Sequence, residues 1–266
     1  MSTPRRLVLL NGVYGAPGHF DRLREALPPE LVPEVHTFRR QGLPDPSPRD
    51  SFAPMVERLD RAVSANGDGP FVLFGFSLGG ALALEYLIAH PERVSALILL
   101  NSFDRFDASP LHYGSMPMMR MWPPTWTHPR LAARAVYQMP RMRRGLFHAD
   151  ASLATIEQGV RLAASEITQA DVNFQLAHLY LPRASAPPSL AGLAERTPVL
   201  LLSSRDDIIV PPRHTTWLAE RMPAARRLPP FEGGHAFLQH DATGLAREVS
   251  RFLGEVDGGE GRRASA

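Results

Sequence analysis

The chain of 266 residues contains no cysteine and no lysine, and all 29 of its basic side chains are arginines. Without cysteine there can be no disulfide and no thiolate chemistry, which fits a reducing compartment, and we expect a cytoplasmic protein. The arginines are nearly balanced by 27 acidic residues, for a formal charge of +2, and they are scattered along the sequence. Nothing in this distribution resembles a basic stripe, so no nucleic-acid partner is expected.

Long apolar runs are also missing. No segment approaches the roughly 18 consecutive apolar residues of a membrane helix. The apolar stretch of residues 7–10 is too short for the core of a signal peptide, so the sequence predicts neither membrane insertion nor a leader. With 44% hydrophobic residues, the chain can nevertheless bury a full core without covalent staples.

Apolar segments alternate with helical patterns along most of the chain, which indicates a parallel sheet flanked by helices. We expect strands near residues 7–10, 34–39, 70–75, 94–100, 198–203 and 225–228. We expect helices near residues 18–27, 53–66, 78–89, 213–222 and 242–254. No internal repeat is present.

A five-residue motif stands between a predicted buried strand and a predicted helix: Gly75-Phe76-Ser77-Leu78-Gly79. A Gly-x-Ser-x-Gly turn at a strand-to-helix junction is typical of a nucleophile elbow, which holds the serine on a strained turn with its hydroxyl exposed. The two glycines remove the Cβ atoms that would clash in so tight a turn. Ser77 is therefore the candidate nucleophile.

Two later segments could supply the partners that a serine nucleophile needs. The predicted strand of residues 198–203 leads to Asp206 and Asp207, and His235 precedes the last predicted helix. A histidine with an ordinary pKa near neutrality can take the serine proton. A carboxylate behind the ring fixes the tautomer and stabilises the imidazolium. The order Ser, Asp, His is that of α/β-hydrolases.

On these motifs the chain resembles the α/β-hydrolase fold family over nearly its whole length. The resemblance implies an α/β fold: about six mostly parallel strands flanked by helices, with an inserted helical cap. The core would comprise residues 1–102 and 197–256, and the cap residues 103–196, which lack strand alternation. Residues 257–266 are predicted to form a disordered tail. Because the first strand begins so early, the two antiparallel strands that often open this fold are expected to be absent.

The resemblance also distinguishes the two aspartates and suggests an oxyanion hole. Family members usually place the acid four residues before the proline of Asp-x-x-Val-Pro, which selects Asp207; the alternative is an aspartate that only caps the next helix. The backbone N–H groups of Val13 and Leu78 would bind the oxyanion. Asn11 replaces the histidine usual in the first of these turns, which could instead be a glycine-rich turn without a catalytic part. This turn lacks the glycine pattern of a phosphate-binding loop.

Within the predicted cap, Met116, Met121 and Trp122 belong to a methionine-rich segment. This segment either packs the cap on the core or forms an adaptable apolar wall of the substrate pocket. The second interpretation favours a small, mostly apolar acyl substrate. No metal or other cofactor is expected, because the histidines at positions 112, 128, 148, 178 and 240 show no metal-ligand spacing. The arginines of residues 141–144 are interpreted as a solvated helix face.

Three functions remain open. The first is a serine hydrolase that acts on carboxylic esters or related acyl compounds through an acyl-enzyme. The second is a lyase, cyclase or acyltransferase that uses the same three residues without a cofactor. The third is a binding or adaptor protein, because residues 97–103 and 224–227 are similar to maspardin-like members, some of which are thought to be adaptors with eroded catalytic positions. The presence of both Asp207 and His235 favours an enzyme, and serine at position 77 excludes chemistry that needs a nucleophilic aspartate.

Overall fold

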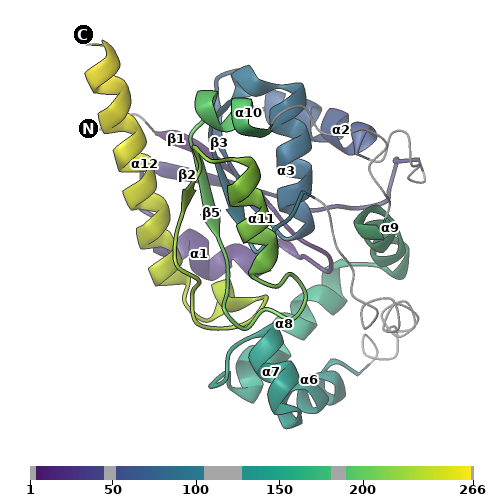
Figure 1. The fold of residues 1–266 in the computed structure, drawn as a ribbon. Coiled ribbons are helices and arrows are strands. Elements are labelled where there is room, and N and C mark those ends of the chain that lie inside the picture. The colour runs from purple at the N-terminus through teal and green to yellow at the C-terminus, as the bar shows by residue number, and fades with distance from the viewer. Residues whose placement is uncertain (1–3, 45–51, 105–127, 181–189, 265–266) are drawn as a thin grey trace.

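A computed structural model describes residues 4–44, 52–104, 128–180 and 190–264 (Figure 1). Six strands form one sheet in the order β2-β1-β3-β4-β5-β6, and every neighbouring pair is parallel. The strands are β1 (Arg5–Leu10), β2 (Leu31–His36), β3 (Phe71–Phe76), β4 (Val94–Leu100), β5 (Val199–Leu202) and β6 (Arg226–Arg227). Because parallel strands need long crossover connections, helices lie between them along the chain.

Helices cover both faces of this sheet (Figure 1). They are α1 (Asp21–Ala26), α2 (Ala53–Ser64), α3 (Leu78–Ala89), α10 (Leu190–Arg196), α11 (Arg213–Arg221) and α12 (Ala242–Ala264). The described residues also form three short 3-10 turns: η1 (Pro17–Phe20) before α1, η2 (Pro91–Arg93) after α3 and η3 (Phe237–Gln239) before α12. In the described chain, no helix is both long and apolar enough to cross a membrane.

Side chains of the central strands alternate between two hydrophobic clusters, one on each face. In β3, Phe71 and Leu73 pack with α2 and α3, whereas Val72 and Phe74 pack with α1 and α12. This alternation follows from the two-residue period of a strand. Both faces are covered, so the strand is apolar throughout, as expected for a parallel sheet.

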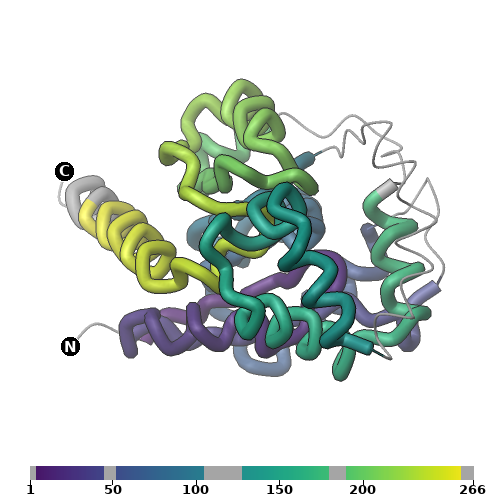
Figure 2. Tube along the Cα trace, turned by 90° about the horizontal axis from the view of Figure 1, so that it is seen from below, coloured from purple at the N-terminus to yellow at the C-terminus, as the bar shows by residue number. Residues whose placement is uncertain are grey.

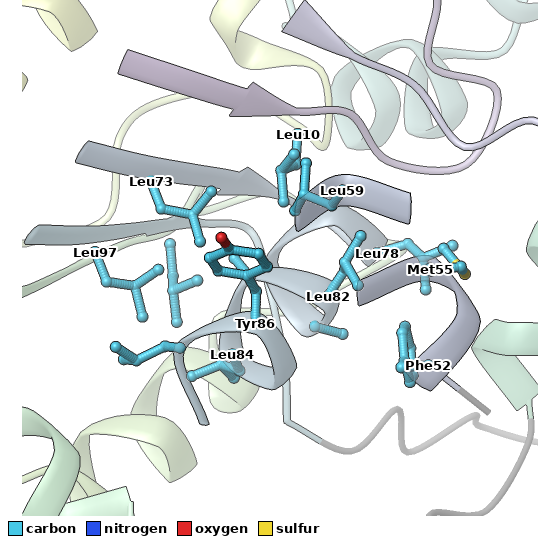
Figure 3. Close-up of a cluster of buried hydrophobic side chains, with 14 of the residues drawn as sticks. Leu10, Phe52, Met55, Leu59, Leu73, Leu78, Leu82, Leu84, Tyr86 and Leu97 are labelled. Atoms are coloured by element: carbon cyan, nitrogen blue, oxygen red, sulfur yellow. The ribbon is translucent and has the colours of Figure 1, made fainter. Parts of the chain in front are cut away.

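The larger cluster surrounds Tyr86 of α3 (Figure 3). Its ring is buried, and its hydroxyl donates to Asp60 Oδ1 of α2 at 2.8 Å. Burial, together with this carboxylate, raises the pKa of Tyr86. The bond satisfies the one polar atom that this aromatic side chain brings into the core, and it ties α2 to α3.

Between β4 and β5, the described residues form four further helices: α6 (Pro129–Gln138), α7 (Pro140–Leu146), α8 (Leu153–Glu166) and α9 (Gln169–Tyr180). Figures 1 and 2 show α6, α7 and α8 gathered at one end of the sheet. They share a small cluster of their own that includes Val136 and Ile156. The helical character predicted for this part of the chain is therefore found in its described residues.

The predicted second strand is displaced by three residues. It was expected at residues 34–39 and lies at Leu31–His36. The observed strand includes Pro33, which lacks the N–H that a central strand needs. However, β2 is an edge strand whose only neighbour is β1, and there a proline is tolerated.

The prediction of a disordered tail at residues 257–266 also differs from the structure, because α12 continues to Ala264. No proline interrupts this segment, and each glycine weakens a helix by only about 1 kcal/mol relative to alanine. Asp257 forms an ion pair with Arg5 of β1, with 2.8 Å between Oδ1 and Nη1. This contact attaches the later part of the helix to the sheet.

Candidate active site

Ser77 lies on the turn that joins β3 to α3, as the motif predicted. Its φ of 56° and ψ of −123° are unusual for a residue other than glycine. Side chains at Gly75 or Gly79 would overlap the backbone of neighbouring segments, so the turn can be this tight only with glycine at both positions. The serine N–H donates to the carbonyl of Leu100 at 3.0 Å, which fixes the turn against β4.

Three residues that are far apart in the sequence meet at this turn. His235 Nε2 lies 3.0 Å from Ser77 Oγ, and His235 Nδ1 lies 2.7 Å from Asp207 Oδ2. An ionised carboxylate can only accept, so Nδ1 carries the ring proton and Nε2 presents its lone pair to the serine hydroxyl. The arrangement can therefore move a proton from Ser77 to His235.

The carboxylate of Asp207 is fully buried. Its Oδ1 accepts from the N–H groups of Ile209 and Val210, both at 2.8 Å, while Oδ2 faces the histidine. The adjacent Asp206 points elsewhere, and its Oδ1 pairs with Arg144 Nε at 2.9 Å. Of the two predicted candidates, Asp207 thus contacts the imidazole and Asp206 contacts the end of α7.

The loop that carries His235 is attached to α7. The His235 N–H donates to the carbonyl of Gly145 at 3.0 Å, and the Ala236 N–H donates to Leu146 at 2.7 Å. A Cβ atom at Gly234 would overlap the backbone of Gly145. The last carbonyls of a helix have no partners within it, and here the histidine loop supplies their donors.

The turn after β1 passes directly over the serine. A Cβ atom at Gly12 would lie 2.7 Å from the Cβ and 3.1 Å from the Oγ of Ser77. Val13 is the next residue of this turn, and it lines the same cavity as His235. Leu78 is the first residue of α3, and the N–H of a first helical residue has no acceptor within its helix.

Asn11 holds this turn in place of the family's usual histidine. Its side chain is fully buried, and Nδ2 donates to the carbonyl of Ala16 at 2.8 Å. The Gly15 N–H donates to Gly12, which closes the turn from within. The conformation of this turn therefore does not depend on a histidine at position 11.

A cavity of about 200 Å³ opens beside His235. It is walled mainly by apolar side chains from the turn after β1, the end of α7, α6 and α8, among them Val13, Phe76, Val136, Leu146, Phe147, Val160, Ala163, Ala164 and Leu238. Among the described residues, no acidic or arginine side chain lines it. Such a cavity favours an uncharged, mostly hydrocarbon group.

His19 connects the two sides of the cavity. Its Nδ1 accepts from the Ala16 N–H, and its Nε2 bonds the carbonyl of Gly159 in α8, both at 3.0 Å. Burial lowers the pKa of His19, because the charged ring would lose its hydration. The neutral ring therefore joins the core to α8, a role that the sequence alone did not indicate.

The other predicted residues are distributed as follows. Met116, Met121 and Trp122 lie outside the described residues, as does His112. His178 is buried between the rings of Phe52 and Phe174, and His148 stacks on His240 with 3.9 Å between ring centroids. Within the described ranges, no group of three or more His, Asp or Glu side chains could hold a metal ion.

Two polar residues at the end of β4 also touch the site, and sequence reasoning gave them no role in it. Asn101 binds the backbone of His235, and Ser102 binds the backbone of Ser77. One signal could have found them, because ligands and functional groups of parallel α/β sheets gather beyond the carboxyl ends of the strands.

A family model and two curated relatives show what this chain is similar to. A model of the alpha/beta hydrolase fold matches residues 38–241. A Neisseria meningitidis protein named pimeloyl-[acyl-carrier protein] methyl ester esterase is 30% identical over 258 residues, covering 89% of this chain and 88% of its own. A Cronobacter turicensis protein named a carbamate hydrolase (RutD) is 27% identical over 253 residues, covering 86% and 84%.

Solved structures agree on the fold. A structure from work on carboxylesterases of Nitrososphaera gargenis superposes with a TM-score of 0.75 at 16% identity, covering 96% of this chain and 91% of the other. MenH from S. aureus gives 0.68 at 19% identity, covering 97% and 96%. The chain belongs to the α/β-hydrolase fold family, and it is a hydrolase-type enzyme.

Proposed function

We propose that this protein is a serine esterase that cleaves esters of uncharged, mostly apolar acyl groups. The observation that carries the proposal is the continuous chain of hydrogen bonds from Asp207 through His235 to Ser77. A serine hydroxyl is a weak nucleophile until a base takes its proton, and this chain supplies that base.

The reaction follows from the positions of these atoms. Ser77 Oγ attacks the ester carbonyl carbon while its proton moves to His235 Nε2. The tetrahedral intermediate then expels the alcohol, which takes the proton from Nε2, and leaves an acyl-enzyme. Water loses a proton to Nε2 as it attacks the acyl carbon, and collapse of the second intermediate releases the acid and restores Ser77. Throughout, Asp207 orients the ring and stabilises the imidazolium.

The developing oxyanion needs fixed donors in both steps. The N–H groups of Val13 and Leu78 are the proposed pair, because the turn at Gly12 lies against Ser77 and Leu78 begins α3. One such donor typically contributes about 10²–10³ in turnover. Because both donors belong to the backbone, this contribution survives the change from histidine to Asn11.

The cavity supports the proposed substrate class. Its apolar walls meet His235 and would receive an acyl chain at the point where the acyl-enzyme forms. The relative from Neisseria meningitidis is named for an acyl methyl ester, a class of substrate whose acyl chain fits this apolar wall. The names of both relatives imply hydrolysis, and they therefore support a hydrolase over the lyase, cyclase and acyltransferase alternatives.

Labelling with a fluorophosphonate tests the proposal. The wild type should lose activity as one adduct forms on Ser77, identified by mass spectrometry. Ser77→Ala should take up no label and should lower turnover by about 10⁴–10⁶-fold. Its free energy of unfolding should hardly change, because only a hydroxyl is removed. Full labelling of Ser77→Ala would place the nucleophile elsewhere, and an unlabelled wild type would favour the adaptor function.

A further inference from the structure

Two polar residues, Asn101 and Ser102, directly follow β4, and no more than 1% of either is exposed. Buried polar side chains almost always form hydrogen bonds, so the partners of these two residues indicate their role. The partners belong to the base and to the nucleophile.

Both the nitrogen and the oxygen of the Asn101 carboxamide form hydrogen bonds. Nδ2 donates to the carbonyl of His235 at 2.9 Å and to Ser204 Oγ at 2.7 Å, and Oδ1 accepts from the Ser204 N–H at 2.7 Å. Ser204 follows β5 and is fully buried. The histidine loop is thereby attached to the ends of β4 and β5, in addition to its attachment to α7.

Ser102 makes the corresponding contact to the nucleophile. Its Oγ donates to the carbonyl of Ser77 at 2.9 Å, beside the Gly80 N–H, which donates to the same oxygen at 2.9 Å. A Cβ atom at Gly80 would overlap the Ser102 side chain, so glycine at that position makes room for the hydroxyl.

Neighbouring residues of a regular strand point to opposite faces of the sheet. The φ of 46° at Asn101 ends that alternation. Asparagine is among the residues that tolerate this left-handed conformation. The positive φ at Asn101 allows two consecutive side chains to contact two parts of one site.

We propose that Asn101 and Ser102 are positioning residues that set the distance between Ser77 Oγ and His235 Nε2. One side chain binds the main chain of the base and the next binds the main chain of the nucleophile, so the single peptide unit that follows β4 relates the two. This inference rests on the proposed function, because proton transfer between these atoms is the step that it serves. Displacing such groups by about 1 Å can cost on the order of 10²-fold in rate.

Asn101→Gly is the first test, because glycine adopts a positive φ freely and keeps the backbone while the carboxamide is lost. We expect kcat to fall by about 10–100-fold with KM changed less than about twofold. Ser102→Ala should lower kcat by a smaller factor, since Gly80 still binds the Ser77 carbonyl. Ser203→Ala is the matched control: its hydroxyl is buried in the same region and has no protein partner among the described residues, so kcat should not change.

Two readouts separate positioning from a loss of stability. In a His235→Ala background, Asn101→Gly should cause no further loss of residual turnover, because its effect acts through the imidazole. Independently, the proton between His235 Nδ1 and Asp207 should give a far-downfield NMR signal. We expect that signal to shift or broaden in Asn101→Gly and to stay in place in Ser203→Ala.

If Asn101→Gly is folded and keeps both the wild-type kcat and the wild-type signal, the proposal is wrong. It is equally wrong if the variant loses the same factor with and without His235. Should Asn101→Gly fail to fold, Ser102→Ala decides by the same two readouts. A wild type that neither labels nor hydrolyses esters would overturn the proposed function, while the NMR signal would still test the positioning.

Discussion

The carboxyl edge of the sheet and the helices α6–α8 build opposite sides of the same cavity, and they are held very differently. At the sheet edge, Ser77, Asn101, Ser102 and Asp207 are almost completely buried. The side chains of Asn101, Ser102 and Asp207 are bound to backbone groups, and the hydroxyl of Ser77 contacts His235 Nε2. The helices face the cavity with side chains that make no hydrogen bonds, such as Val136 and Ala163.

The contrast separates two tasks. Proton transfer depends on small distances, so the reacting groups are supported by strands that the whole core stabilises. Binding an apolar chain needs only shape and the absence of charge, so it can be left to helices with a small cluster of their own. Changes at the sheet edge should therefore alter turnover, and changes on the helices should alter selectivity.

The largest expected effect within this comparison lies at the sheet edge and separates two neighbouring carboxylates. Asp207→Asn should lower kcat by roughly 10⁴-fold, because an amide favours the wrong tautomer of His235. Asp206→Asn removes only the ion pair with the exposed Arg144 and should leave kcat nearly unchanged. Steady-state kinetics of both purified variants test this. Equal losses would mean that the two carboxylates act together.

An intermediate effect is expected from filling the cavity from α8. Ala163→Phe should shorten the space for the acyl chain. Each methylene that no longer fits removes about 0.8 kcal/mol of transition-state binding, so two methylenes should lower kcat/KM on the order of tenfold. The measurement is kcat/KM for p-nitrophenyl esters from acetate to decanoate. Acetate should be affected least. Ala154→Phe, at an exposed position on the same helix, is the control. A uniform loss along the series would show that the variant disturbs the reacting groups instead.

The smallest effect concerns the connection between the two regions at His19. Burial lowers the pKa of this ring, with Glu166 and Asp21 partly opposing the shift, so the folded state favours the neutral form. The resulting stability is present above the ordinary pKa near 6.5 and is lost as the pH falls through the lower folded value. Urea unfolding at pH 7 and pH 5 should therefore show a smaller decrease for His19→Gln than for the wild type. His36 and His240, whose pKa values are also lowered by burial, titrate in both proteins and cancel in the comparison. An identical decrease would assign the pH dependence to other groups.

What the sequence could predict depended on distance along the chain. The elbow at Ser77 was visible because a buried strand, two glycines and a helix are adjacent in sequence. The spacing from Asp207 to Pro211 marked one aspartate, and the structure places that one against the imidazole. The bonds of Asn101 span 103 and 134 residues, so no local pattern could show them. The same holds for the attachment of α7 to the histidine loop. The edge position of β2, which decided whether Pro33 could join the strand, also became known only from the assembled sheet.

Left-handed backbone at residues other than glycine occurs within the described chain at Tyr14, Ser77 and Asn101. All three lie in the turns that follow the carboxyl ends of β1, β3 and β4, and such conformations cost about 1–3 kcal/mol each. Directed evolution for heat resistance alone would relieve this strain most directly by placing glycine at Ser77, which ends the proposed chemistry. A thermostable descendant that remains active must therefore gain its stability elsewhere, on the far side of the sheet or in α12, and keep these three angles as they are.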